Sequence, residues 1–147
     1  MKIFLTGGTG LVGNAVARKL LARGHSVTAL VRDPTRAGPL LPGADLVAGD
    51  ITAEGSLLPA MRGAEWVFHA AGMPEQWQPD DTIFDRVNRG GTANVMRAAR
   101  EAGVRRVIYT STMDVFEAAP GGTLVDEKQV AHVVDERGDR QGVDRIE

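Results

Sequence analysis

Three glycines near the amino terminus have the spacing of a phosphate-binding loop. Gly7, Gly10 and Gly13 lie in the segment Thr6-Gly7-Gly8-Thr9-Gly10-Leu11-Val12-Gly13. A pyrophosphate is bound by backbone N–H groups that point at it, and glycine leaves room for its close approach. Where such a loop opens a helix, the helix dipole adds to the attraction. We therefore expect a dinucleotide to be bound by Gly7, Thr9, Gly10, Leu11, Val12 and Gly13.

The same glycines have two other interpretations. Their spacing differs from the common Gly-x-Gly-x-x-Gly fingerprint, so they could serve only as a turn that lets helix pack on strand. Gly8 and Gly13 have the separation of Walker-loop glycines, but Asn14 and Ala15 follow them where Lys and Ser or Thr are required. The NTPase interpretation therefore fails. The position of the loop, after an apolar run and before a helical pattern, favours a dinucleotide.

The choice of dinucleotide depends on the end of the second predicted strand, where Arg32 and Asp33 follow Val31. An acidic residue there accepts a hydrogen bond from the ribose 2′-hydroxyl of NAD, whereas an arginine accommodates the 2′-phosphate of NADP. Because Arg32 comes first, we favour NADP(H), with NAD(H) as the alternative. Asp33 precedes Pro34 and is better explained as the first residue of a turn.

Alternating strands and helices are expected to position these residues. The apolar pattern predicts strands at 2–6, 26–31, 45–48, 65–69 and 105–110, and helices at 11–22, 53–62 and 82–102. Pro and Gly predict a loop between 34 and 43, and Thr52 suits the N-cap of helix 53–62. This order predicts an α/β domain, a Rossmann-type doubly wound parallel sheet that is incomplete at its C-terminal end. We assign residues 1–116 to this dinucleotide-binding domain.

The remaining residues, 117–147, depart from the pattern. They contain Pro120-Gly121-Gly122, many charges and one apolar patch, Val130 to Val134. This atypical charged tail could either pair a strand or fray, and we interpret it as a truncated or altered continuation of the domain.

Composition limits the classes of function. A net charge of −2 gives no electrostatic basis for binding nucleic acid. The sequence has no cysteine and its three histidines lie far apart, so we expect no metal site. No apolar run approaches the roughly 20 residues of a membrane span, so no membrane partner is expected and a cytoplasmic location is predicted.

Several ordered motifs resemble one family, the extended short-chain dehydrogenase/reductases, also called the NAD-dependent epimerase/dehydratase family. The resemblance covers roughly residues 1–127 and is closest to the dihydroflavonol-reductase and sugar-epimerase-like branch. It implies hydride transfer between NAD(P)(H) and a small carbonyl compound or nucleotide sugar. The motifs that carry it are TGGTGLVG at 6–13, Gly49-Asp50-Ile51, His69-Ala70-Ala71-Gly72, Val87-Asn88 with Gly91-Thr92 and Asn94, and Tyr109-Thr110-Ser111-Thr112.

The resemblance implies roles for five further residues. Asp50 would meet the adenine amino group and Ile51 would line the adenine pocket. Ala70 and Ala71 would let the backbone approach the cofactor, and Asn88 would hydrogen-bond near it. Each role has a structural alternative: Asp50 as a helix cap, the alanines as close packing, and Asn88 as a solvated helix residue.

The family also places a catalytic Ser or Thr after the fifth strand, which implies Thr112 here, with Ser111 as the second candidate. A hydroxyl there stabilises the substrate oxygen as charge develops, although it could instead only satisfy loop backbone. The family's Tyr-x-x-x-Lys pair is missing from this sequence. Its one tyrosine is Tyr109, and Met113 stands four residues later.

Three hypotheses of function follow. The chain could be an oxidoreductase or epimerase fragment from a truncated or frame-shifted gene. It could be a catalytically silent dinucleotide-binding or sensing module, which the missing Tyr-x-x-x-Lys pair favours. It could also be an incomplete domain that forms a homo-oligomer to cover an apolar sheet edge.

Overall fold

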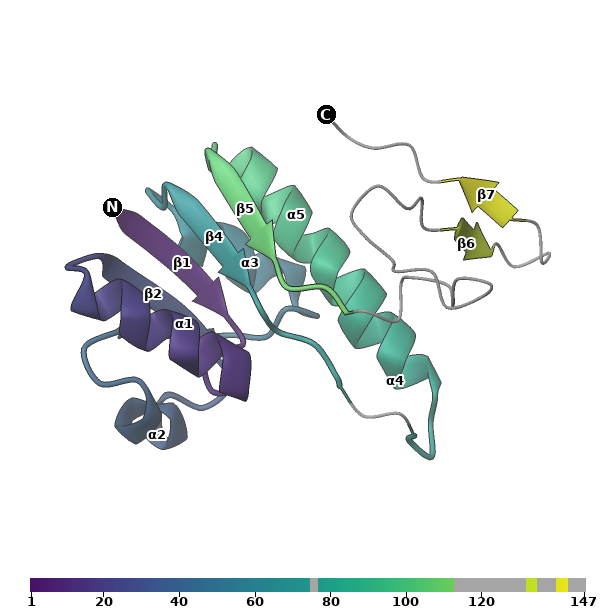
Figure 1. Cartoon of the computed structure of the whole chain (residues 1–147), viewed down its shortest axis with the longest axis horizontal. Coiled ribbons are helices and arrows are strands. Elements are labelled where there is room, and N and C mark those ends of the chain that lie inside the picture. The colour runs from purple at the N-terminus through teal and green to yellow at the C-terminus, as the bar shows by residue number, and fades with distance from the viewer. Residues whose placement is uncertain (75–76, 113–131, 135–139, 143–147) are drawn as a thin grey trace, which may run out of the picture. The chain divides into compact units, whose positions relative to one another are not determined.

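The computed structural model describes residues 1–74, 77–112, 132–134 and 140–142, and the chain divides into two units, Met1–Thr110 and Ser111–Glu147. The first unit is a five-stranded parallel sheet with helices on both faces (Figure 1). The strand order is β3-β2-β1-β4-β5, so the Rossmann-type fold is confirmed. The strands are β1 (Lys2–Thr6), β2 (Ser26–Val31), β3 (Asp45–Ala48), β4 (Trp66–His69) and β5 (Arg106–Tyr109).

Alternate residues of the central strand supply the two cores on either side of the sheet. Ile3 and Leu5 pack on one side with α1 (Leu11–Ala22), and Phe4 packs on the other with α3 (Glu54–Met61) and α5 (Thr92–Glu101). Because both faces of a parallel sheet are covered, the strands read as apolar runs. This explains why all five strand predictions agree with the structure to within one residue.

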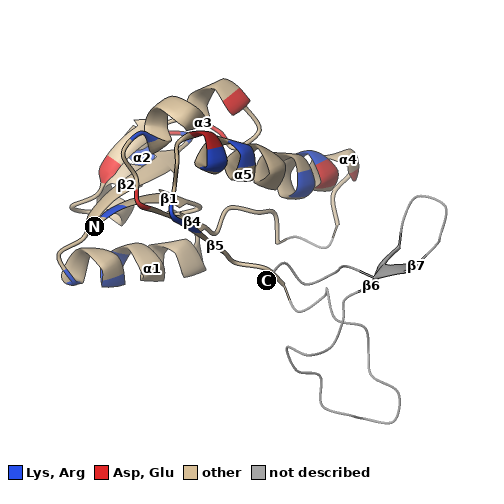
Figure 2. Cartoon of the chain, turned by 90° about the horizontal axis from the view of Figure 1, so that it is seen from above, with Lys and Arg blue, Asp and Glu red and all other residues tan. Residues whose placement is uncertain are grey.

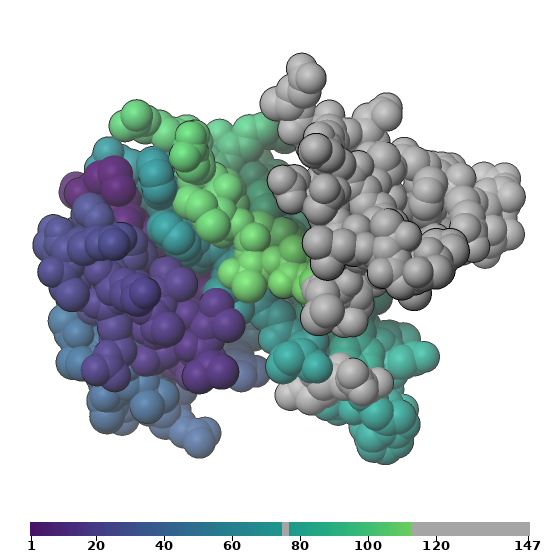
Figure 3. Space-filling view, viewed as in Figure 1, coloured from purple at the N-terminus to yellow at the C-terminus, as the bar shows by residue number. Residues whose placement is uncertain are grey.

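Within the described residues of the first unit, the α1 side of the sheet is covered over only part of its width. Helix α1 lies over β1 and β2, while residues of β5 are visible at the surface in Figure 3. Trp66 and Phe68 of β4 are only partly buried there, and the Arg106 guanidinium lies 5.1 Å from the centre of the Trp66 ring. Among the described strands, β5 lies at the edge of the sheet, and one of its faces is only partly covered by the described residues of the first unit.

The predicted loop at 34–43 is wrong over its first part. Helix α2 (Pro34–Ala37) and the 3₁₀ turn η1 (Gly38–Leu40) occupy it. Asp33 caps α2, because its Oδ1 accepts hydrogen bonds from the N–H groups of Thr35 (3.0 Å) and Arg36 (3.2 Å). Proline at the first helical position is compatible with a helix start, since its missing N–H would have no partner there.

The predicted N-cap of the third helix is also wrong. Ala53 occupies the cap position of α3 and makes no side-chain cap. The Thr52 hydroxyl instead donates to Asp50 Oδ1 at 2.8 Å, and the Thr52 N–H donates to the same atom at 2.8 Å. The Thr52 hydroxyl thus belongs to the turn that the Asp50 side chain forms, one residue before the cap position of α3.

The helix predicted at 82–102 consists of three consecutive segments. These are α4 (Thr82–Phe84), a π-helical segment η2 (Asp85–Gly91) and α5, which run as one continuous helix in Figure 1. Charges of both signs lie on η2 and α5 (Figure 2). Arg97 of α5 forms an ion pair with Glu54 of α3, an exposed link of the kind that contributes about 0–1 kcal/mol.

In the described residues of the second unit, β6 (His132–Val134) and β7 (Arg140–Gly142) form an antiparallel pair, so this part of the tail pairs a strand. The predicted boundary at residue 116 lies outside the described residues. None of the helices in the described part of the chain combines the length and the apolar character that a membrane crossing requires.

Candidate functional site

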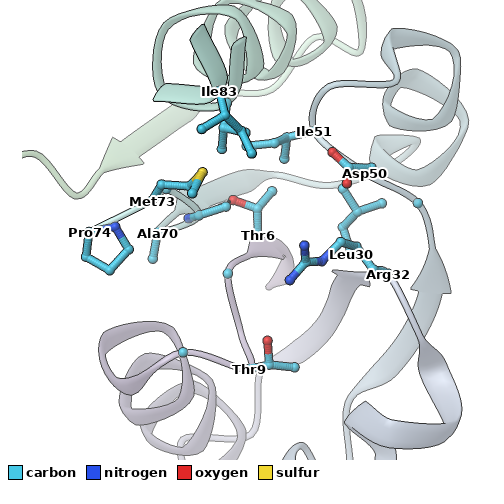
Figure 4. Close-up of a pocket in the computed structure, with 16 residues that line it drawn as sticks. Thr6, Thr9, Leu30, Arg32, Asp50, Ile51, Ala70, Met73, Pro74 and Ile83 are labelled. Atoms are coloured by element: carbon cyan, nitrogen blue, oxygen red, sulfur yellow. Dashed lines mark hydrogen bonds between the residues drawn. The ribbon is translucent and has the colours of Figure 1, made fainter. Parts of the chain in front are cut away.

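A pocket of about 470 Å³ opens at the carboxyl ends of four strands (Figure 4). The strand order reverses about β1, and open α/β sheets bind ligands at this kind of switch point. The lining residues come from the ends of β1 and β2, from the loops after β1, β2, β3 and β4, and from the helix that begins at Thr82. They are Thr6, Gly7, Thr9, Gly10, Leu30, Arg32, Gly49, Asp50, Ile51, Ala70, Ala71, Gly72, Met73, Pro74, Ile83 and Val87.

The fold needs glycine at some of the three predicted positions and not at others. Gly7 has a φ of 74°, and a Cβ there would lie 2.5 Å from the backbone of Ala70. A Cβ at Gly13 would lie 2.2 Å from the carbonyl oxygen of Gly7. At Gly10, φ is −82° and an added Cβ would meet only Gly7 O, at 3.4 Å. The fold therefore requires glycine at 7 and 13 but not at 10, although Gly10 lines the pocket.

The start of α1 presents main-chain donors next to this loop. The first hydrogen bond of the helix runs from the Asn14 N–H to the Gly10 carbonyl at 2.9 Å, and Gly10 supplies no side-chain cap. The N–H groups of Leu11, Val12 and Gly13 precede that bond and belong to the unsatisfied first turn. The side chains of Leu11 and Val12 are exposed and do not line the pocket. Their predicted role is thus one for the backbone alone.

Arg32 and Asp33 are used differently. Arg32 lines the pocket and points into it (Figure 4), and within the described residues it forms no ion pair. The Asp33 carboxylate caps α2 and lies outside the pocket lining. Asp50 brings a carboxylate to the same end of the pocket as Arg32, with Oδ1 bound to Thr52.

A buried hydrogen-bond network lies beneath the loops after β1 and β4. His69 is fully buried, and its Nδ1 lies 2.6 Å from Thr6 Oγ1 while its Nε2 lies 3.0 Å from Thr92 Oγ1. The Thr6 hydroxyl also accepts from the N–H of Ala71 at 3.4 Å. Burial lowers the pKa of His69 to about 4, so the imidazole is neutral at pH 7. The network ties β1, β4 and the following helix together below Ala70 and Ala71.

Asn88 has a role that neither sequence interpretation described. It does not line the pocket and it is not simply solvated. Its Oδ1 accepts from the Met73 N–H at 2.7 Å, and its Nδ2 donates to the Met73 carbonyl at 3.2 Å. Asn88 therefore holds the loop after β4, and Met73 of that loop lines the pocket.

Comparison with known proteins identifies the family. A model of NAD(P)H-binding domains matches residues 7–142. The chain belongs to this family. More fully, it is an NAD(P)-binding domain of the extended short-chain dehydrogenase/reductase and epimerase type, as the resemblance implied.

Two curated relatives and one solved structure illustrate the match. A Synechocystis protein provisionally named as a dihydroflavonol 4-reductase is 40% identical over 126 residues, covering 84% of this chain and 36% of that protein. The 2-alkyl-3-oxoalkanoate reductase of Stenotrophomonas maltophilia is 36% identical over 119 residues, covering 81% of this chain and 36% of that protein. UDP-glucose 4-epimerase of Thermus thermophilus, in complex with NAD, matches with a TM-score of 0.77 at 27% identity, covering 87% of this chain and 43% of the epimerase. The chain spans 36% of the length of each of the two curated relatives.

The pocket of this NAD(P)-binding domain fits a dinucleotide on its own geometry. Gly10 has room for a side chain as far as the protein is concerned, yet it stands at the pocket beside the unsatisfied first turn of α1. A ligand with a diphosphate explains both features, because it needs main-chain donors and close approach. The apolar side chains of Ile51, Met73 and Ile83 offer a surface for a ring.

The predicted catalytic hydroxyls belong to a different part of the chain. Ser111 and Thr112 are exposed and are the first residues of the second unit. The pocket lining comes entirely from the first unit, so the roles of Ser111 and Thr112 stay predictions. The resemblance favours Thr112 because Val115-Phe116 aligns with the family's usual Val-Tyr, and these two residues lie outside the described residues.

Eight lining residues were not predicted as site residues. Four of them belong to the family motifs, namely Thr6, Gly49, Gly72 and Val87, and the other four do not, namely Leu30, Met73, Pro74 and Ile83. Leu30 pairs in register with Thr6, so the end of β2 could have been included with the end of β1. Met73 and Pro74 follow the His69-Ala70-Ala71-Gly72 motif and could have been found as its continuation. Ile83 carries no signal of its own, because an apolar residue on a helix is usually part of the core.

Proposed function

We propose that this chain binds NADP(H) in preference to NAD(H), and that it supplies the cofactor-binding part of a reductase or epimerase acting on a carbonyl compound or nucleotide sugar. The observation that carries the NADP(H) preference is the contrast between Arg32, which points into the pocket, and Asp33, whose carboxylate caps α2. The names of the relatives, two reductases and an epimerase, support the substrate class.

Three parts of the cofactor have residues suited to hold them: the diphosphate, the 2′-phosphate and the adenine. The N–H groups of residues 11–13 would bind the diphosphate, and the Arg32 guanidinium would bind the 2′-phosphate. Asp50 and Ile51 would contact the adenine. The bound cofactor supplies or accepts the hydride, and the protein orients it. A hydroxyl of Thr112 or Ser111 would donate a hydrogen bond to the substrate oxygen as negative charge develops there.

A second candidate, a binding module without catalysis, is favoured by the position of Tyr109. It is the one tyrosine of the sequence and it lies within β5, where its ring stacks on His69 with centroids 5.2 Å apart. Tyr109 therefore lies in the sheet, whereas the tyrosine of the family's Tyr-x-x-x-Lys pair lies one helical turn before a lysine. Oxidation of NADPH by carbonyl substrates, lost in Thr112→Val, would support the enzyme, and binding without turnover would support the module.

The cofactor preference is tested by titrating the chain with NADPH and NADH while following tryptophan fluorescence. A charge-assisted hydrogen bond to a phosphate contributes about 1.5–3 kcal/mol, so we expect NADPH to bind about tenfold to a hundredfold more tightly. Arg32→Ala should remove that difference by weakening NADPH alone. Asp33→Ala is the matched control and should leave the preference unchanged. Equal affinities in the wild-type chain would contradict the proposal.

A further inference from the structure

The helix formed by α4, η2 and α5 contacts two pocket loops through two asparagines. In η2, the Asn88 side-chain amide bonds both the N–H and the carbonyl of Met73, at 2.7 and 3.2 Å. A side chain that satisfies both polar groups of one residue fixes that residue's main chain. The π-helical form of this segment is itself uncommon and occurs frequently at functional sites.

The second contact fixes Ile51 in the loop after β3. Asn94 Nδ2 donates a hydrogen bond to the carbonyl of Ile51 at 3.0 Å. The Ile51 side chain packs so closely on the helix that a Cβ at Gly91 would lie 2.6 Å from Ile51 Cδ1. The helix thereby sets both the main chain and the side chain of a residue that lines the pocket.

The two contacts act on different ends of the pocket. In Figure 4, Asp50 lies at the Arg32 end, next to Ile51, whereas Met73 and Pro74 lie at the other end with Ala70. Neither asparagine lines the pocket. Their influence on a ligand must therefore pass through Ile51 and Met73.

We propose that Asn94 and Asn88 are positioning residues that set the two halves of the dinucleotide site separately. This proposal rests on the proposed function. Asn94, through Ile51, sets the half of the site at the Arg32 end, which would bind the adenosine 2′-phosphate portion of NADP(H). Asn88, through Met73, sets the other half, which would bind the rest of the cofactor. Without Asn88, the N–H and carbonyl of Met73 lose their partners, the loop becomes mobile, and binding must then restore its order.

The test compares two probes by isothermal titration calorimetry, NADPH and adenosine 2′,5′-bisphosphate, which contains only the adenosine end. Asn88→Leu keeps the branched shape of the side chain and removes both hydrogen bonds. It should weaken NADPH about tenfold and leave the bisphosphate within about twofold of its wild-type affinity. Asn94→Leu should weaken both probes about tenfold.

Asn14→Leu is the matched control, because Asn14 also ties a helix to a backbone carbonyl, that of Leu40 at 2.7 Å, without lining the pocket. It should leave the ratio of the two affinities unchanged. A general loss of structure would also leave this ratio unchanged, so a changed ratio in Asn88→Leu reports a local effect on the site. If Asn88→Leu melts near the assay temperature, Asn88→Ser removes the same bonds with a smaller side chain.

Equal weakening of both probes by the Asn88 variant, or no weakening of NADPH, would overturn the inference. The wild-type titration tests the proposed function separately. If the wild-type chain binds neither probe, the proposed function fails and this inference falls with it. If it binds both and the ratio does not move in the Asn88 variant, only the inference fails.

Discussion

Replacing Gly10 and Gly13 by alanine separates the glycine that a ligand needs from the glycine that the fold needs. Both belong to the same loop and are three residues apart. An alanine at Gly13 would place its methyl group 2.2 Å from the oxygen and 2.6 Å from the carbon of the Gly7 carbonyl. These are backbone atoms, so no side-chain rotation relieves the contact and the loop or the helix must shift.

The magnitude for Gly13→Ala follows from two opposing effects. Overpacking costs about 1–3 kcal/mol, and contacts this short with backbone place it at the upper end. Alanine in a helix gains about 1 kcal/mol over glycine. The net destabilisation is therefore about 2 kcal/mol. For a domain of about 100 residues, this lowers the melting temperature by about 10 °C.

Gly10→Ala should do the opposite. Its φ of −82° suits alanine, and the nearest atom to the added methyl group is Gly7 O at 3.4 Å, an ordinary contact. The entropy that alanine removes from the unfolded chain is offset by its poorer N-cap propensity, so the free energy of unfolding should stay within about 0.5 kcal/mol. NADPH affinity should fall at least about tenfold, because the methyl group displaces the diphosphate from main-chain donors.

Thermal unfolding without ligand and NADPH titration of each variant decide the matter. We expect the Gly10→Ala variant to be as stable as the wild-type chain but to bind NADPH poorly, and the Gly13→Ala variant to have a lowered melting temperature. Two results would refute it: a Gly10→Ala variant that melts as low as Gly13→Ala, or one that binds NADPH as tightly as the wild-type chain.

Three further variants test other parts of the structure. Asp33→Ala should lower the free energy of unfolding by about 1 kcal/mol, because α2 loses its cap, and urea unfolding would show no change if the cap were unimportant. Gly91→Ala should weaken binding of adenosine 2′,5′-bisphosphate by displacing Ile51, and unchanged calorimetric affinity would contradict the contact. His69 should make stability depend on pH. Its pKa is about 4 in the folded protein and 6.5 when unperturbed, so the unfolded chain takes up a proton first as the pH falls. Stability is then complete above pH 6.5 and falls toward pH 4, by about 1 kcal/mol between pH 7.5 and 5.5, and His69→Gln should remove this part of the urea-unfolding profile.

The sequence predicted the sheet well because the buried strands are short apolar runs bounded by glycine or charge. It predicted the glycine loop, Arg32, Asp50, Ile51 and the two alanines as neighbours of one site, and all of these except Leu11, Val12 and Gly13 of the loop line one pocket. These residues directly follow predicted strands, and parallel strands bring their carboxyl ends to one edge. Chain position alone was enough to gather them.

The parts that escaped prediction depend on side-chain hydrogen bonds between distant segments. Asn88 and Met73 are 15 residues apart, and Asn94 and Ile51 are 43 apart. Nothing in the periodicity of a helix indicates which of its polar residues will bind a loop. The π-helical segment was missed for a related reason, since a change from one helical register to another leaves the apolar pattern nearly intact. Helix α2 was missed because proline and glycine were read as loop residues, although Asp33-Pro34 is also a helix start.

The two residues after β2 differ in what each must give up to meet a ribose. Both N–H groups of α2 bind Asp33 Oδ1, so turning this carboxylate out of the cap toward a ribose would cost about 1 kcal/mol. Its return would be one hydrogen bond to a neutral group. Arg32 breaks no ion pair of the described residues when it meets a 2′-phosphate, and it gains a charge-assisted bond that is stronger than a neutral one.

The same difference between Arg32 and Asp33 makes a switch to NADH preference by Arg32→Ala alone incomplete, because Asp33 remains bound to α2. The double variant Arg32→Ala with Thr35→Pro, which removes the N–H nearest to Asp33, should bind NADH more tightly than Arg32→Ala does. Equal NADH affinity in the single and double variants would show that the cap does not restrain Asp33.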